Sequence, residues 1–192
     1  MRLIIIILLL MLSIPAFSEE IQGGVELDWP LLNQEARDQA INYYRDILFK
    51  DIKYKIDKTQ FQSRKKDSNF IENETLVKKN LGQQPDRKMV GFYLLNKLLF
   101  IYGVQYFSDF YHIYYYNTLG GLEYVDIFNK HIDDYPNISY QYNKKGDLVA
   151  VYYNNSEYDQ YAYLANGKFK GRWYGDRFYD KKAKIVMTRK LY

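Results

Sequence analysis

The spacing of apolar residues changes along the chain from a helical to a strand-like period. Between Pro30 and Lys50 apolar residues recur every three or four positions, which predicts one amphipathic helix. Asp28 fits the N-cap of that helix, where aspartate is favoured, and Pro30 fits its first turn, where proline is favoured. The opposite face carries charges of both signs, so we expect the apolar stripe to pack on a sheet rather than on a membrane.

The segment between this helix and the following strands is mostly polar. The alternation of Ile52, Tyr54 and Ile56 is typical of a strand, and the same residues also fit two further turns of helix. The basic run from Lys58 to Asp67 reads as a solvated loop. A second short helix is predicted from Phe70 to Leu81, before a stop at Gly82, and 83–87 reads as a linker.

From Lys88 onward the pattern predicts a ladder of short strands separated by turn residues. Asn96-Lys97 is a candidate two-residue hairpin turn, and later turns contain glycine. Consecutive strands are expected to be neighbours, which gives an antiparallel meander. The predicted strands are Met89–Leu95, Leu98–Phe107, His112–Tyr116, Leu122–Phe128, Ile138–Tyr142, Leu148–Tyr153, Gln160–Tyr163, Lys168–Tyr174 and Lys184–Leu191.

The predicted fold class is therefore α+β, with an N-terminal amphipathic helix and a short second helix before an antiparallel meander of repeated hairpins. The organisation is a signal peptide over 1–18, a helical segment with a basic loop over 19–87 and the meander over 88–192. Residues 19–192 are expected to form one folded unit, because 174 residues suit a single domain. The helix would cover one face of the sheet and leave the other face wet and rich in tyrosine.

A short pattern occurs twice in the meander, 21 positions apart. It places two tyrosines, a glycine turn, an apolar residue and an aromatic pair in fixed order. The two copies are Tyr140, Tyr142, Gly146, Leu148, Tyr152, Tyr153 and Tyr161, Tyr163, Gly167, Phe169, Trp173, Tyr174. A looser copy begins 26 positions earlier with Tyr114, Tyr116, Gly120 and Leu122.

The second copy, from Gly167 to Gly175, resembles the core of the MORN repeat, with an aromatic residue, a glycine, a tryptophan and a glycine in order. It is most similar to the degenerate MORN-like variants of exported bacterial proteins, and the resemblance covers about Tyr114 to Tyr174. The first copy departs from the pattern at Ala150 and Tyr152. The resemblance implies one hairpin per repeat and an elongated single-layer sheet.

The N-terminus predicts export. Arg2 precedes an apolar run from Leu3 to Leu12, and Ala16 and Ser18 supply the small residues of a cleavage site, which is the layout of a secretory signal peptide. The run is shorter than the roughly 20 residues that span a bilayer, so a retained membrane anchor is the alternative to cleavage. We expect a periplasmic or extracellular protein with no transmembrane span after cleavage.

The amino-acid composition limits the kinds of site and partner that the chain can have. The chain has no cysteine, which excludes disulfides, thiolate metal sites and thiol nucleophiles, and in an exported protein favours a bacterial source. The formal net charge of +4 permits weak attraction to anionic surfaces, and export argues against nucleic acid as a partner. The 22 tyrosines favour strands, and this structural role is the preferred interpretation over a tyrosine-rich binding surface.

The best candidate binding surface is a basic strip on the last repeat. Lys168, Lys170 and Arg172 alternate with apolar residues, so strand geometry predicts that they share one face. Lys181, Lys182 and Lys184 follow. Aromatic rings beside lysines also suit stacking on sugars. The predicted binding residues are Lys168, Lys170, Arg172, Tyr161, Tyr163 and Trp173.

No catalytic residue, metal ligand or cofactor is predicted. His112 lies among strand aromatics, and His131 with Asp133 reads as a turn-rich loop before Pro136. Paired carboxylates for hydrolysis are available at Glu157 with Asp159 and at Asp176 with Asp180, each in a predicted turn.

The function predicted from these features is a non-enzymatic exported interaction module. Its partner would be an envelope glycan, an anionic lipid surface or another exported protein. Two alternatives stay open: an exported hydrolase with carboxylates gathered on the sheet, and an immunity or antitoxin-like partner protein, which rests on fold analogy alone.

Overall fold

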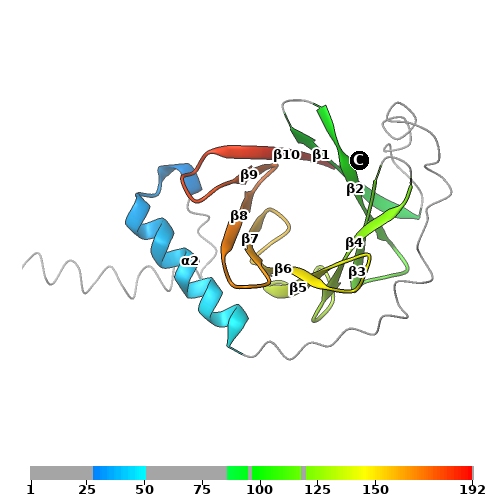
Figure 1. Ribbon diagram of the computed structural model, residues 1–192, viewed down its shortest axis with the longest axis horizontal. Coiled ribbons are helices and arrows are strands. Elements are labelled where there is room, and N and C mark those ends of the chain that lie inside the picture. The colour runs from blue at the N-terminus through cyan, green and yellow to red at the C-terminus, as the bar shows by residue number, and fades with distance from the viewer. Residues whose placement is uncertain (1–27, 51–85, 95–96, 118–119, 192) are drawn as a thin grey trace, which may run out of the picture. The chain divides into compact units, whose positions relative to one another are not determined.

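The computed structural model describes residues 28–50, 86–94, 97–117 and 120–191, and its main feature is a closed ring of ten antiparallel strands (Figure 1). Each strand pairs with its neighbours in sequence, which confirms the predicted antiparallel meander. The strands are β1 Arg87–Leu94, β2 Lys97–Tyr106, β3 His112–Tyr116, β4 Leu122–Phe128, β5 Asn137–Asn143, β6 Leu148–Asn154, β7 Asp159–Leu164, β8 Phe169–Tyr174, β9 Arg177–Tyr179 and β10 Ile185–Leu191.

The ring closes because the first strand pairs with the last. Val90 lies opposite Leu191 and Tyr93 lies opposite Thr188, so β1 and β10 run antiparallel to each other. Closure removes both exposed sheet edges. The expectation of an open, elongated sheet with one wet face is therefore wrong, because the face turned away from the helix is the inside of a barrel.

The N-terminal helix begins later than predicted. Trp29–Leu31 forms a short 3₁₀ turn, η1, and Asp28 makes no side-chain cap there. The α-helix α2 spans Gln34–Phe49, and the Asn33 side chain caps it by accepting a hydrogen bond from the Ala36 N–H at 2.8 Å. Proline therefore occupies the 3₁₀ turn instead of the first α-helical turn. The chain divides into two units, Met1–Leu32 and Asn33–Tyr192, and α2 belongs to the second.

The predictions made for the segment between α2 and β1 lie outside the described residues. They concern the strand or helical extension at Ile52–Ile56, the basic loop and the second helix at Phe70–Leu81. Lys97, which was predicted to lie in a hairpin turn, belongs to β2 and lies opposite Leu94, and Asn96 lies outside the described residues.

Helix α2 packs on the outer face of the ring, as Figure 1 shows, which confirms that its apolar stripe meets the sheet. The Tyr44 ring lies 4.7 Å from that of Tyr153 and 4.2 Å from that of Tyr161, measured between centroids. The Tyr163 hydroxyl donates a hydrogen bond of 2.7 Å to the backbone oxygen of Ile41. These contacts join the helix to β6 and β7.

The face that meets α2 continues around the barrel. Residues opposite each other in paired strands share a face, so this outward face runs from Tyr163 to Val151, Tyr140 and Ile127. On β1 to β5 it carries a buried apolar cluster, which consists of Met89, Tyr102, Val104, Tyr114, Tyr116, Leu122, Val125, Ile127 and Tyr142. Much of the tyrosine content therefore serves packing.

Each copy of the sequence repeat forms the same type of hairpin turn. Gly120, Gly146 and Gly167 adopt φ values of 75°, 82° and 81°, and each donates its N–H to the carbonyl three residues earlier. Ala183 holds the same place between β9 and β10, with φ 59° and the same hydrogen bond to Asp180. The structure thus contains a fourth copy of the turn, which the sequence hides because alanine replaces glycine.

Every one of these four hairpins also contains a β-bulge at the same place. In the third copy Tyr163 lies opposite Phe169 and Ala162 lies opposite Gly171, so Lys170 is an extra residue. A bulge inserts one residue into one strand and re-aims the side chains around it. The extra residues of the other copies are Glu123, Val149 and Val186.

The fourth turn predicts a stabilising substitution. A residue with a Cβ is strained at positive φ by about 1 kcal/mol, and glycine is not, so Ala183→Gly should raise the free energy of unfolding by up to about 1 kcal/mol. The matched change Gly146→Ala should lower it by a similar amount. Urea denaturation of the three proteins measures both effects. A loss of stability in Ala183→Gly would contradict the assignment of the turn.

Candidate functional site

The barrel encloses an inner cavity of about 370 Å³, which lies within the size range of small-molecule sites. Its wall is formed by inward-facing side chains from nine of the strands and includes both aromatic and polar groups. The apolar part includes Val90, Phe92, Trp173, Phe178 and Met187, and the polar part includes Tyr115, Asp126, Gln141, Tyr152, Lys170 and Arg189.

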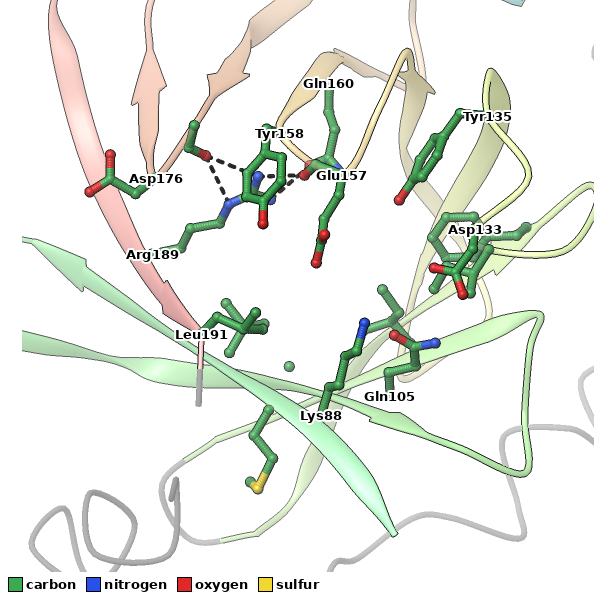
Figure 2. Close-up of a pocket in the computed structure, with 17 residues that line it drawn as sticks. Lys88, Gln105, Asp133, Tyr135, Glu157, Tyr158, Gln160, Asp176, Arg189 and Leu191 are labelled. Atoms are coloured by element: carbon green, nitrogen blue, oxygen red, sulfur yellow. Dashed lines mark hydrogen bonds between the residues drawn. The ribbon is translucent and has the colours of Figure 1, made fainter. Parts of the chain in front are cut away.

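An outer cavity of about 170 Å³ adjoins the inner one. The two share Val90, Ile113, Phe128, Gln160 and Arg189, so the outer cavity continues the inner one toward one end of the barrel. Figure 2 shows Lys88 and Gln105 on one side of this space and Glu157 and Arg189 on the other. The exposed side chains Asp133, Tyr158 and Asp176 also line the outer cavity, which therefore opens to solvent.

The four repeats place equivalent side chains on the wall of the inner cavity. Four residues after the apolar residue that follows each turn stand Asp126, Tyr152, Trp173 and Arg189, in chain order. The two central copies carry an aromatic ring at this position. The first and last copies carry an acid and a base, so the departures from the repeat pattern supply the charges of the site.

Asp126 is the buried acid of the inner cavity, with only 4% of its surface exposed. The Tyr115 hydroxyl donates a hydrogen bond of 2.6 Å to Oδ2. Oδ1 accepts no hydrogen bond within the described residues. Burial raises the pKa of Asp126 from 3.8 to about 6, although Tyr115, the Gln141 amide and the charge of Lys170 act in the opposite direction. The Gln141 amide is near enough to influence the pKa without forming a hydrogen bond to Oδ1.

Lys170 brings a positive charge to the same space. The β8 bulge turns its side chain into the inner cavity. Because the cavity admits solvent, the side chain is exposed even though the barrel wall surrounds it. Desolvation lowers the pKa of Lys170, and the charge of Asp126 raises it in part. The two charges therefore interact, yet among the ion pairs of the described residues there is none between Lys170 and Asp126.

Arg189 lies where the two cavities meet and is held rigidly. Its guanidinium donates to the backbone oxygens of Glu157 at 2.7 Å and Gly175 at 3.0 Å, and to Oε1 of Gln160 at 3.0 Å (Figure 2). It also lies 4.8 Å from the centroid of the Trp173 ring, a cation–π distance. These contacts fix Arg189 as part of the wall, whereas Lys170 borders the cavity without an ion pair to a described residue.

The apolar part of the wall is an aromatic cluster. The Trp173 ring centroid lies 5.0 Å from that of Phe178 and 5.7 Å from that of Phe92. Met187 and Tyr152 pack against this cluster. A rigid aromatic wall beside polar groups gives a ligand an apolar body contact and a fixed orientation.

The basic strip predicted from the alternation of β8 does not form one surface. Lys168 is exposed in the turn before the strand, Lys170 faces the inner cavity, and Arg172 is 2% exposed on the outward face. The bulge at Lys170 is the physical reason, because one extra residue reverses the alternation that the prediction assumed.

The remaining predicted binding residues are also divided. Tyr161 and Tyr163 are buried under α2, and Trp173 faces the inner cavity. Beside the tyrosines, Arg172 Nε donates to Asp159 Oδ1 at 2.6 Å in a buried ion pair, and the guanidinium lies 4.8 Å from the Tyr161 ring centroid. The structure therefore brings only Lys170 and Trp173 to one site. Binding by any of the six stays a prediction.

The two members of each carboxylate pair considered from sequence have different surroundings, although one member of each pair lines the outer cavity together with Asp133. His112 Nδ1 lies 2.8 Å from Asp109 Oδ1, and the His131 ring stacks on Phe110 at 4.6 Å. Glu157 and Asp176 line the outer cavity, Asp159 pairs with Arg172, and the Asp180 side chain accepts from backbone N–H groups of its turn. Within the described ranges no cluster of three potential metal ligands occurs.

Asp126 and Arg189 were not predicted from sequence as residues of the site. A signal for Asp126 exists, because it alternates with Tyr124 and Phe128 along one face of a strand, where a lone acid between aromatic residues is unusual. Arg189 has no comparable signal, since its role depends on the fourth repeat and on the closure of the barrel.

Comparison with protein-family models, with curated proteins and with solved structures found no match for this chain. Separately, no helix among the described residues is long and apolar enough to span a membrane.

The buried ion pair beneath α2 predicts a strong coupling. Removing one partner leaves an uncompensated buried charge, so Asp159→Asn or Arg172→Met should each cost about 3–5 kcal/mol of stability. The double variant should lose clearly less stability than the sum of the losses in the two single variants. Lys144→Met, which breaks an exposed pair with Glu123 at 3.0 Å, serves as control and should cost less than about 1 kcal/mol. Additive losses in the denaturation series would contradict the pairing.

The raised pKa of Asp126 predicts how stability depends on pH. The folded chain favours the protonated acid more than the unfolded chain does. The stability that this preference contributes is fully present below pH 3.8 and is lost as the pH rises through about 6. A rise of this size corresponds to about 3 kcal/mol. Relative to Asp126→Asn, the wild-type protein should lose about this much stability between pH 4 and pH 7.

Urea denaturation at intervals across this pH range measures the difference between the two proteins. Tyr115, Tyr152 and Lys170 face Asp126, and the raised pKa values of the tyrosines keep both neutral throughout. Parallel pH profiles of the wild type and Asp126→Asn would show that Asp126 titrates as an ordinary surface acid.

Proposed function

We propose that the protein is an exported, non-enzymatic binding module that takes a small molecule with an apolar body into the inner cavity of its barrel. The observation that carries the proposal is a cavity of about 370 Å³ that combines an aromatic wall with a buried carboxylate oxygen lacking a partner among the described residues. Native buried polar atoms are nearly always hydrogen-bonded, and a ligand can supply the missing donor.

The inside of the barrel is better suited to binding than the outer face. The outward tyrosines beside α2 are engaged in packing, as Tyr44 and Tyr161 are with each other and Tyr163 is with the helix backbone. In the inner cavity, by contrast, Lys170 and Asp126 Oδ1 are both available to a ligand. The outer cavity offers the route of entry, with Arg189 at the junction.

The remaining parts of the proposal rest on sequence. The predicted signal peptide favours a periplasmic or extracellular location, and the repeated hairpins support a relation to degenerate MORN-like proteins of bacteria. An envelope glycan, an anionic lipid surface or another exported protein stays a predicted partner of the outer surface. The hydrolase and the immunity-protein alternatives also stay predictions.

Binding inside the barrel can be tested with N-phenyl-1-naphthylamine, a neutral apolar fluorescent probe. We expect saturable binding of one molecule per chain, with energy transfer from Trp173, which lies on the cavity wall. Ile113→Trp places a large ring where the two cavities meet and should abolish binding. The matched variant Ile138→Trp lies on the outward face, opposite Tyr153, and should bind normally.

Circular dichroism and urea denaturation of both variants establish that each remains folded. Absence of binding to the wild-type protein, or equal binding by the two folded variants, would overturn the proposal.

A further inference from the structure

The two charged side chains of the inner cavity point to a more specific ligand. Asp126 Oδ1 is buried and accepts no hydrogen bond within the described residues, and Lys170 borders the same cavity without an ion pair to Asp126. An acceptor and a cation are thus presented to the same space while neither neutralises the other directly. The protein leaves one donor and one acceptor to be supplied from outside.

We propose that Asp126 and Lys170 together bind the two charged groups of a small zwitterion, with an ammonium group on Asp126 and an anionic group on Lys170. The proposal rests on the proposed function, since it requires a ligand inside the barrel. The chemical class is a compact molecule that carries an ammonium and a carboxylate close together on an apolar body, such as an α-amino acid with an aromatic side chain.

The electrostatics of the cavity favour a zwitterion over either single ion. A cation bound to Asp126 would be repelled by Lys170, and an anion bound to Lys170 would be repelled by Asp126, because the two charges already influence each other. Such interactions are stronger inside a protein than in water. A ligand with both charges turns each repulsion into an attraction, so the site discriminates by the unfavourable contact as well as by the favourable one.

The aromatic cluster determines what the rest of the ligand must be. Phe92, Trp173 and Phe178 form a continuous apolar surface on the wall of the same cavity. Trp173 and Asp126 stand at equivalent positions of two repeats, so both point inward from the same level of their hairpins. A ring attached to the charged group would stack against this surface.

Four compounds that share a phenyl body separate the contributions of the charges. Phenylalanine carries both charges, 2-phenylethylamine the cation alone, 3-phenylpropionate the anion alone and 2-phenylethanol neither. Binding is measured at neutral pH by displacement of N-phenyl-1-naphthylamine and by ligand-detected NMR. We expect phenylalanine to bind at least about tenfold more tightly than each of the other three.

Two variants should give a crossed pattern. Asp126→Asn should weaken the binding of phenylalanine and 2-phenylethylamine and leave 3-phenylpropionate equal or tighter. Lys170→Met should weaken phenylalanine and 3-phenylpropionate and leave 2-phenylethylamine equal or tighter. Lys145→Met, which removes an exposed turn lysine outside the cavity, should change none of the four affinities.

The outcomes separate this inference from the proposed function. Binding of the fluorescent probe together with equal affinities for the four compounds, or with no binding of any of them, would overturn the zwitterion site and leave the binding module intact. An equal loss of affinity for all four compounds in both variants would also overturn the zwitterion site. Failure of the probe itself to bind inside the barrel would overturn both.

Discussion

Antiparallel pairing between β1 and β10 is the constraint on which the rest of this structure depends. It gives every strand two neighbours and divides the side chains of the sheet into an enclosed set and an outward set. Without that pairing, Asp126, Lys170 and Arg189 would lie on an open, solvated face, where burial would not shift their pKa values. The inner cavity, its electrostatics and the proposed ligand all follow from closure.

The repeated hairpin explains how a short pattern builds a site with different chemical groups. Each copy contributes the same turn, the same bulge and the same inward position on the cavity wall. Where the pattern is kept, the inward residue is aromatic, as at Tyr152 and Trp173. Where it has degenerated, the residue is charged, as at Asp126 and Arg189. Regular copies therefore provide the packing, and the divergent copies provide the specificity.

The local features of the fold could be predicted from sequence, and the non-local ones could not. Alternation and glycine turns located nine of the ten strands, and the three-and-four spacing located the helix, because these signals reside in neighbouring residues. The short strand β9 was missed, since its turn uses Ala183 instead of glycine. Closure was missed, since pairing of Val90 with Leu191 joins opposite ends of the sheet. The expectation that Lys168, Lys170 and Arg172 share one face was wrong, because the bulge at Lys170, which alternation cannot reveal, reverses the faces.

The central claim is that the sheet is closed around a cavity, and NMR on the protein tests it most directly. The account predicts backbone nuclear Overhauser effects between Val90 and Leu191 and between Phe92 and Arg189, with amide exchange in β1 and β10 as slow as in the inner strands. Absence of those cross-strand effects, together with fast exchange along β1 and β10, would show an open sheet and contradict the account.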